Sequence, residues 1–471
     1  MVFSSLVFLF LFLPICLIAY FLSPTLKIKN LVLLAFSIFF YAWGEPIWVF
    51  LLIFSGTVDF VIAKIIDKNR DNWKSKFALI ASLTINLGLL GFFKYGNFIV
   101  ENINALFNMQ IPLSSMTLPI GISFYTFQTL SYSIDVYRNE VKVQKSFSNF
   151  QLFVALFPQL IAGPILRYSE LEAQLNDRTS TLEKTSQGIS RFLIGLGKKV
   201  LIANYVGEIA TTILDGGLVG LPVIDAWFGV LMFTFQIYFD FSGYSDMAIG
   251  LGKIFGFEYG ENFNYPYISK SITEFWRRWH ISLGSFFRDY VYIPLGGNRS
   301  HQFRNIVVVW FLTGLWHGAS WNFVLWGMYF AVLLILEKYI FKGIMSKLPK
   351  ALSWSYTFIL VMIGWVLFYY TDLTKCFALL KIMFGLAGHE LYNANTIYTV
   401  SSRYLIMIIS ALASTPIVSF IKKNLETIGN ELPHFQTIRM TFVAMVNLVI
   451  IFLCTTSLIG QSFNPFLYFR F

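Results

Sequence analysis

Long apolar runs alternate with short polar breaks along nearly all of this 471-residue chain. The first run, residues 2–21, is about 20 residues long, which is enough to cross roughly 30 Å of hydrocarbon as a helix. No basic segment precedes this run and no A-x-A site follows it, so we expect a retained span and not a signal peptide. Further apolar runs lie at residues 31–43, 47–66, 77–95, 118–137, 149–165, 187–214, 222–256, 305–341, 352–371, 401–421 and 437–460.

Several of these runs are too short or too polar to span simply. The pattern therefore predicts an all-α polytopic membrane protein with roughly ten to eleven transmembrane helices plus re-entrant helices. The polar stretch at 167–191 is expected to form a loop with an amphipathic helix. No internal repeat or soluble domain interrupts the pattern, so we expect residues 1–471 to form a single membrane domain.

Composition supports this interpretation, since hydrophobic residues make up 56% of the chain and charged residues only 13%. Too few charges remain to cover a soluble exterior, which excludes a cytosolic enzyme, a disordered chain and a nucleic-acid-binding domain. The net charge of +10 is expected in loops that obey the positive-inside rule. Cys16, Cys376 and Cys454 lie far apart without a CxxC pair, so neither a metal site nor a disulfide is indicated.

Ionisable residues gather in one aromatic-rich stretch between residues 262 and 299. Charged groups are costly at membrane depth, so such a cluster should pair internally and face a polar cavity. An interfacial amphipathic helix with Arg and Trp side chains at the headgroups is the alternative. The ionisable residues of the cluster are Glu274, Arg277, Arg278, His280, Arg288 and Asp289.

His317 lies in a stretch, residues 306–336, that contains no Asp, Glu, Lys or Arg. Trp316, Gly318, Ala319 and Ser320 flank it, and we expect them to leave room for a group to approach the ring. An ionisable residue at this depth is a functional hypothesis, because imidazole can take a proton from an attacking hydroxyl. A core histidine whose ring is simply hydrogen-bonded is the alternative.

The sequences FWRRWHISLGSFFRDYVYIPLGGNR and WHGASWNFVLWG, which hold both histidines, resemble the membrane-bound O-acyltransferases. They are most similar to the bacterial branch that acylates cell-envelope polysaccharides. The stretches LPIGISFYTFQTLSYSIDVYR, FPQLIAGPILRY and FDFSGYSDMAIGLG also resemble that branch. The resemblance covers residues 30–340 and the end of the chain, although Gly284 stands where relatives often have Ser. It implies a central tunnel, thinned from both membrane faces, with residues 262–341 as the catalytic core segment.

By this resemblance His317 is the catalytic histidine and His280 is a second functional histidine. For Arg277 and Arg278, structural salt bridges with Glu274 or Asp289 are favoured over a catalytic role. The residues that the resemblance assigns to the tunnel or its support are Trp316, Gly318, Asn322, Arg277, Arg278, Trp279, Ser282, Asp289, Asp240 and Asp246. For Asp240 and Asp246, we favour ion pairs with Arg277, Arg278 or Arg288 over a place in the tunnel wall.

The chain ends in FNPFLYFRF, residues 463–471, which we call the C-terminal segment. Its aromatic side chains could anchor it at the headgroups, with Arg470 snorkelling. It also resembles a motif whose tyrosine is proposed to carry the acyl group across the membrane, which makes Tyr468 a candidate covalent carrier. A phenol with a pKa of ~10 needs a base such as His317 to act as a nucleophile at neutral pH.

The resemblance implies an O-acetyltransferase in the bacterial cytoplasmic membrane that uses acetyl-CoA as donor substrate and binds no cofactor. A separate partner transferase outside the membrane is implied, because the chain has no Ser-His-Asp domain of its own. Peptidoglycan is the favoured acceptor, alginate-type exopolysaccharide is the second, and D-alanyl transfer to teichoic acid is the third. A membrane transporter is the alternative from a different functional class, and an acyltransferase acting on lipid or protein differs only in its acceptor.

Overall fold

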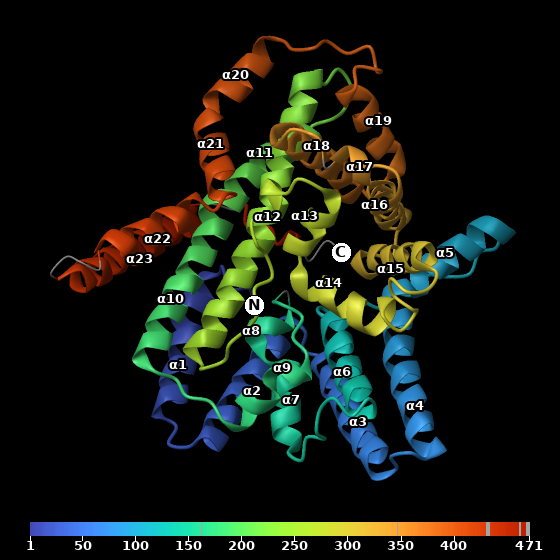
Figure 1. Ribbon diagram of the computed structural model, residues 1–471, viewed down its shortest axis with the longest axis vertical. Helices are drawn as coiled ribbons and strands as arrows, with labels where there is room; N and C mark the ends of the chain where they lie inside the picture. Colours follow the sequence, from blue (N-terminus) through green and yellow to red (C-terminus); the bar gives the residue numbers. More distant parts are fainter. Residues whose placement is uncertain (162, 346, 430–433, 461–462, 468–471) are drawn as a thin grey trace. The chain divides into compact units, whose positions relative to one another are not determined.

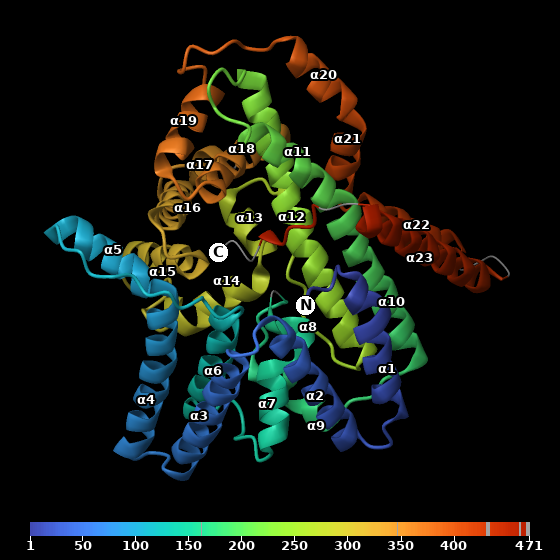
Figure 2. The same cartoon turned by 180° about the vertical axis from the view of Figure 1, so that it is seen from behind.

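The computed structural model describes residues 1–161, 163–345, 347–429, 434–460 and 463–467. Every regular element within these ranges is a helix, which confirms the predicted all-α class (Figures 1 and 2). The chain forms two compact units. The first unit consists of Met1–Phe192 and Tyr244–Gly260, and the second consists of Leu193–Gly243 and Glu261–Phe471. The single membrane domain expected from the sequence stays a prediction.

Polar side chains cap the start of some helices in the first unit. Thr25 caps α2 by accepting a hydrogen bond from the Ile28 N–H, and Ser146 caps α7 in the same way through Asn149. Its helices are η1 (Phe8–Phe12), α1 (Leu13–Leu22), α2 (Leu26–Gly44), α3 (Val49–Lys68), α4 (Trp73–Leu90), η2 (Gly91–Tyr95), α5 (Gly96–Phe107), α6 (Ile122–Tyr137), α7 (Phe147–Ala155), α8 (Phe157–Leu160), α9 (Tyr168–Asn176), most of α10 (Leu182–Gly197) and the end of α12 (Val223–Ile254).

Helices α3, α4 and α6 lie side by side in this unit (Figures 1 and 2). A buried carboxylate joins them, because Asp59 of α3 accepts hydrogen bonds from Asn86 of α4 at 2.7 Å and from Ser133 of α6 at 2.8 Å. Apolar side chains alone would give these helices little mutual preference in lipid, whereas such polar contacts specify which faces meet.

The second unit contains the end of α10, most of α12 and all helices not named above. Two short helices, α13 and α14, lie between the long helices α12 and α15 in the chain, and the expected re-entrant helices stay a prediction. The helices of this unit are η3 (Lys198–Ala203), α11 (Asn204–Leu214), η4 (Pro266–Ile268), α13 (Ile272–Arg278), α14 (Ile281–Phe287), η5 (Arg288–Tyr292), α15 (Gln302–His317), α16 (Trp321–Tyr339), α17 (Lys342–Met345), α18 (Lys350–Tyr369), α19 (Leu373–Met383), α20 (Ala394–Ser402), α21 (Tyr404–Ala413), α22 (Ile417–Gly429) and α23 (Phe435–Gly460).

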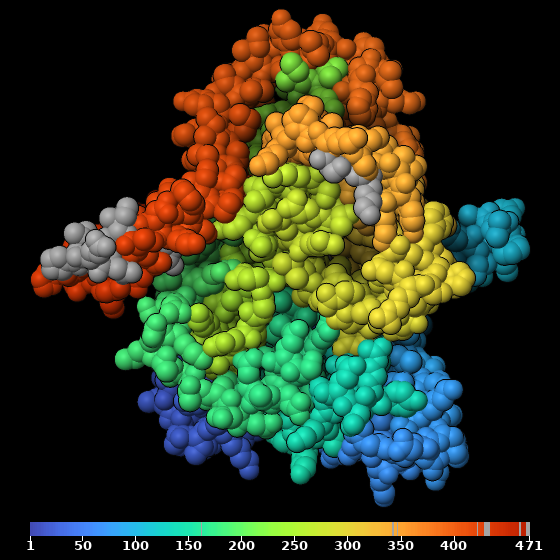
Figure 3. Space-filling model, in the orientation of Figure 1, coloured from blue at the N-terminus to red at the C-terminus, as the bar shows by residue number. Residues whose placement is uncertain are grey.

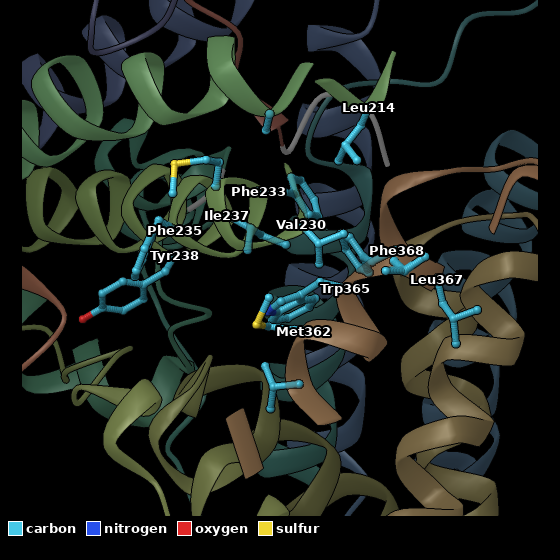
Figure 4. Close-up of a cluster of buried hydrophobic side chains, with 14 of the residues drawn as sticks. Leu214, Val230, Phe233, Phe235, Ile237, Tyr238, Met362, Trp365, Leu367 and Phe368 are labelled. Atoms are coloured by element: carbon cyan, nitrogen blue, oxygen red, sulfur yellow. The ribbon is translucent and has the colours of Figure 1, made fainter. Parts of the chain in front are cut away.

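Large apolar side chains of α12 and α18 form the core of the second unit. Figure 4 shows Phe233 and Ile237 of α12 pointing towards Trp365 and Phe368 of α18, and all four are buried. Aromatic rings dominate this core, which gives it large contact areas and defined ring geometries. The same core reaches the histidine at the end of α15, so the packing of α12 and α18 positions the site.

Helices α15 and α16 form a tight antiparallel pair around small residues. A Cβ atom added to Gly327 of α16 would lie only 2.3 Å from the Trp310 carbonyl oxygen of α15. Glycine at such a contact lets two helix backbones approach closely. The break between the helices, residues 318–320, interrupts the run that the sequence joined as 305–341.

Within the described ranges, seven helices are long and apolar enough to cross a membrane, or eight if α20 and α21 form one bent span. This confirms a multi-pass membrane protein. The first expected span is shorter than predicted, because its apolar helix covers only Phe8–Leu22. The 149–165 run is broken between α7 and α8. The total of ten to eleven spans stays a prediction. The amphipathic helix expected in 167–191 is present as α9, which buries Tyr168, Leu171 and Leu175.

We predict that Gly327→Ala lowers the melting temperature of the detergent-solubilised protein, because the added methyl group meets backbone that cannot move aside. Overpacking of this kind destabilises by about 1–3 kcal/mol. Gly343→Ala is the control, since a Cβ there meets nothing within 4 Å. Equal melting temperatures for the two variants would contradict close packing of α15 on α16.

Candidate active site

Helix α13 is held at its first turn by a carboxylate from another helix. Glu337 of α16 is buried, and its two oxygens accept hydrogen bonds from the N–H groups of Ile272 at 2.6 Å and Thr273 at 3.0 Å. Ser271 caps the same turn by accepting from the Glu274 N–H at 3.0 Å. Negative charge at a helix N-terminus is favourable, so α13 is fixed in place despite its seven-residue length.

His280 stands at the junction of α13 and α14 with a left-handed backbone, φ 45° and ψ 54°. Its ring is buried, and its Nδ1 lies 3.2 Å from the Asn262 Oδ1. That oxygen also accepts from the Ser282 N–H at 3.2 Å and from the Ser282 hydroxyl at 2.9 Å. Since a backbone N–H can only donate, Asn262 presents its oxygen here, and we assign the proton of His280 to Nδ1, which then donates to that oxygen.

This network leaves the Nε2 of His280 as a proton acceptor. Within the described residues, no group forms a hydrogen bond with this buried atom. Aromatic rings surround the imidazole, with ring centroids 4.7 Å away for Phe241 and 5.8 Å away for Trp316. His280 is therefore fixed in tautomer and orientation, as a catalytic or positioning histidine requires.

His317 is the last residue of α15 and lines a small buried cavity of about 30 Å³. Its ring meets Trp326 and Phe368 edge to face, at centroid distances of 4.9 Å and 5.2 Å. The volume is that of roughly one water molecule. The lining residues are Ile237, Asp240, Phe241, Trp279, His317, Trp326, Trp365, Phe368, Phe466 and Leu467.

Both histidines pack against the ring of Trp316, but only His317 lines this cavity. The Trp316 ring is 5.8 Å from the His280 ring and 5.0 Å from the His317 ring. Phe241 lines the cavity and also packs against His280. His317 and Trp279 line the cavity as expected from the sequence, and Asp240 also lines it although an ion pair was favoured for it, whereas His280 is absent from the described lining.

Asp240 and Asp246 have different partners from those predicted. Asp240 pairs with Lys199 at 2.6 Å in the second unit, and Asp246 pairs with Arg191 at 2.6 Å in the first unit. The expected pairing with the arginines of residues 277–288 is therefore wrong. In each case the observed partner comes from residues 187–214, whose helices run alongside α12. The separation of these residues from Asp240 and Asp246 along the sequence did not indicate the pairing.

The predicted ion pair of Arg278 with Glu274 is confirmed, at 2.9 Å, and its structural role stays a prediction. Asp289 instead pairs with Arg288 at 2.6 Å. Arg277 lines a second, larger cavity of about 530 Å³ together with Trp310 and Lys338. Figure 3 shows the surface hollowed there, between α13 and the helices α15 and α16.

The supporting residues near His317 serve packing and hydrogen bonding. The space beside Gly318 is filled, because a Cβ there would lie 2.3 Å from the Phe323 ring. Gly318 thus gives its space to Phe323, and the expectation that the residues around His317 leave room for an approaching group stays a prediction. Asn322 is buried and its amide donates to the Leu367 carbonyl at 3.1 Å, which ties the start of α16 to α18.

Sequence reasoning missed Lys199, Asn262 and the aromatic residues Trp326 and Phe368. Lys199 shares the feature that made His317 a candidate, because it is also an ionisable residue in an apolar run. The sequence pattern also did not predict that Phe466 and Leu467 line the cavity. Tyr468, the candidate carrier, lies outside the described residues.

The chain belongs to the membrane-bound O-acyltransferase family, whose family model matches residues 139–380. It is therefore an acyltransferase, of the O-acetyltransferase branch that acts on envelope polymers. It is 40% identical to the "Probable alginate O-acetylase AlgI" of Azotobacter vinelandii over all of both chains. It is 45% identical to the protein of that name in Pseudomonas aeruginosa, over 84% of this chain and 77% of the relative. It is 33% identical to the "Peptidoglycan O-acetyltransferase" of Helicobacter pylori, over 100% of this chain and 98% of the relative.

We predict that Asn262→Ala lowers the melting temperature, because three donors lose their common acceptor in a buried position. Leaving buried donors unpaired costs about 1–3 kcal/mol. Asn262→Asp should retain more stability, since it keeps an oxygen for the Ser282 N–H. Exposed Asn264→Ala is the matched control, and equal stability of the two alanine variants would refute the network.

Proposed function

We propose that this protein takes acetyl from acetyl-CoA on the cytosolic side of the bacterial cytoplasmic membrane and delivers it outward for esterification of a cell-envelope polysaccharide. The observation that carries the proposal is His317 at the end of α15, in a buried, aromatic-lined cavity, in a chain of an acyltransferase family. The aromatic lining leaves little room for water, which would otherwise hydrolyse an acyl ester or thioester.

In the proposed reaction His317 takes the proton of an attacking hydroxyl as its oxygen adds to the thioester carbonyl. The carbon–sulfur bond then breaks, and the proton passes to the leaving sulfur, so that an ester and a free thiol are formed. His280 acts as a positioning residue in this scheme, because its fixed ring orients Trp316 and Phe241 beside the cavity.

Tyr468 is the proposed first acceptor of the acetyl group. The support is that Phe466 and Leu467, which immediately precede it in the chain, line the cavity of His317. An anchor at the headgroups would not require these two residues to be buried in the second unit, and they are. Base assistance from His317 would supply the activation that a phenol needs at neutral pH.

The acceptor is proposed to be a secreted polysaccharide of the alginate type, reached through a separate partner transferase outside the membrane. The support is the higher identity to relatives named alginate O-acetylase, 40% against 33% for the peptidoglycan O-acetyltransferase, with full coverage of this chain in both cases. This reverses the order of preference drawn from the sequence. Peptidoglycan remains the second candidate.

We predict that His317→Ala abolishes acetylation while the protein still inserts. A deletion strain would be complemented with wild type or variant, and mild-base-labile acetate measured separately on secreted polysaccharide and on purified peptidoglycan. Loss of a general base lowers the rate by about 10²–10⁴-fold. Exposed His301→Asn is the control, because Asn tolerates the left-handed φ of 48° at that residue. Full acetylation with His317→Ala would overturn the mechanism.

We predict that Tyr468→Phe also abolishes acetylation, because the variant lacks the hydroxyl that would carry the acetyl group. Exposed Tyr398→Phe is the matched control. Mass spectrometry of the C-terminal peptide after incubation with labelled acetyl-CoA should detect one added acetyl in wild type and none in Tyr468→Phe. Normal activity of Tyr468→Phe would rule out the carrier role and leave His317 chemistry intact.

A further inference from the structure

The described part of the C-terminal segment, residues 463–467, runs along a buried ion pair. The Lys199 ammonium and the Asp240 carboxylate are 2.6 Å apart, and both side chains are 3% exposed. The Leu467 N–H donates to the Asp240 Oδ2 at 2.9 Å, and the Lys199 ammonium donates to the Pro465 carbonyl. Asn204 adds a side-chain hydrogen bond to Asn464 at 3.1 Å.

The pair is arranged to hold a segment of main chain. A buried ion pair is tolerated only where further hydrogen bonds satisfy its remaining donors and acceptors. Here the backbone of the C-terminal segment supplies them: one carbonyl for the cation and one N–H for the anion. Lys199 lies in the π-helical turn η3, a local distortion that is frequent at functional sites.

The held segment reaches the candidate catalytic cavity directly. Phe466 and Leu467 line that cavity together with Asp240 and His317. One carboxylate therefore contributes to the cavity wall and fixes the backbone of Leu467, which lines the same cavity. The proton transfer proposed for His317 assigns no proton to Lys199 or Asp240.

We propose that the Lys199–Asp240 pair is a dock for the C-terminal segment, and that both residues are positioning residues that hold this segment at His317. The inference rests on the proposed function in one respect, namely that the docked segment takes part in acyl transfer. The docking itself can be tested without any acyl donor or acceptor.

The test uses Phe466→Cys in the full-length, detergent-solubilised protein and follows the rate of maleimide labelling. The native thiols Cys16, Cys376 and Cys454 are buried, and the parent protein measures their background. Adding the double substitution Lys199→Met/Asp240→Leu removes both charges together, so that no unpaired ion remains to unfold the protein. We expect labelling of the new cysteine to accelerate at least tenfold. Lys198→Met, at the adjacent lysine, should leave the rate unchanged.

A swapped pair, Lys199→Asp/Asp240→Lys, separates docking from simple structural support. It restores opposite charges, but it presents a carboxylate to the Pro465 carbonyl and an ammonium to the Leu467 N–H. A structural ion pair would be rescued by the swap, whereas a dock would not. We expect fast labelling in the swapped variant. If the swapped variant does not elute as a monodisperse protein, the labelling rate of the neutral double variant decides whether the pair is a dock.

Acetyl transfer is measured in parallel with Phe466 intact, and we expect at least a tenfold loss in the neutral double variant. Unchanged labelling in that variant, or slow labelling with full activity in the swapped variant, would overturn the dock. Fast labelling with full acetyl transfer would overturn the positioning role. Wild-type protein without acetyl transfer would refute the proposed function, while the labelling result would still decide on the dock.

Discussion

Hydrocarbon offers no hydrogen-bond partner, so a membrane-embedded chain must satisfy its buried polar groups internally. The second unit is organised around three solutions to this constraint. Glu337 satisfies the free N–H groups at the start of α13. Asn262 gathers the donors of the α13–α14 junction onto one oxygen. Lys199 and Asp240 satisfy each other and the backbone of the C-terminal segment. Each joins segments distant in sequence, so the aromatic core packs around fixed polar points.

Aromatic rings then determine what the candidate catalytic histidine can meet. Trp326 and Phe368 contact the His317 ring by their edges, and the cavity beside it holds about 30 Å³. Two of the residues that line this cavity, Phe466 and Leu467, come from the C-terminal segment. The other lining residues belong to α12, α15, α16 and α18, except Trp279, which lies between α13 and α14.

The apolar pattern predicted the helical class and most long helices, because a run of 20 apolar residues has few alternatives in a membrane. Local chemistry also predicted the Arg278–Glu274 pair, whose members are one helical turn apart. Neither the apolar pattern nor local chemistry predicted contacts between segments that are distant in the sequence. Nothing in the sequence near Asp240 indicates Lys199, and the space beside Gly318 depends on where Phe323 folds back. The sequence thus identified which residues are unusual, but pairing them required the packing of helices.

The energetics of the dock make the C-terminal segment and the buried ion pair depend on each other. Breaking a buried ion pair by removing one partner costs about 3–5 kcal/mol, because a charge is left uncompensated. A hydrogen bond to a charged group contributes only about 1.5–3 kcal/mol. Releasing residues 464–467 would lose both hydrogen bonds to the pair, about 3–6 kcal/mol together, and the Asn204–Asn464 hydrogen bond as well. This loss is at least as large as the cost of breaking a buried ion pair, so the docked segment and the pair stabilise each other. The polar anchor of the C-terminal segment thus holds Phe466 and Leu467 in the wall of the His317 cavity.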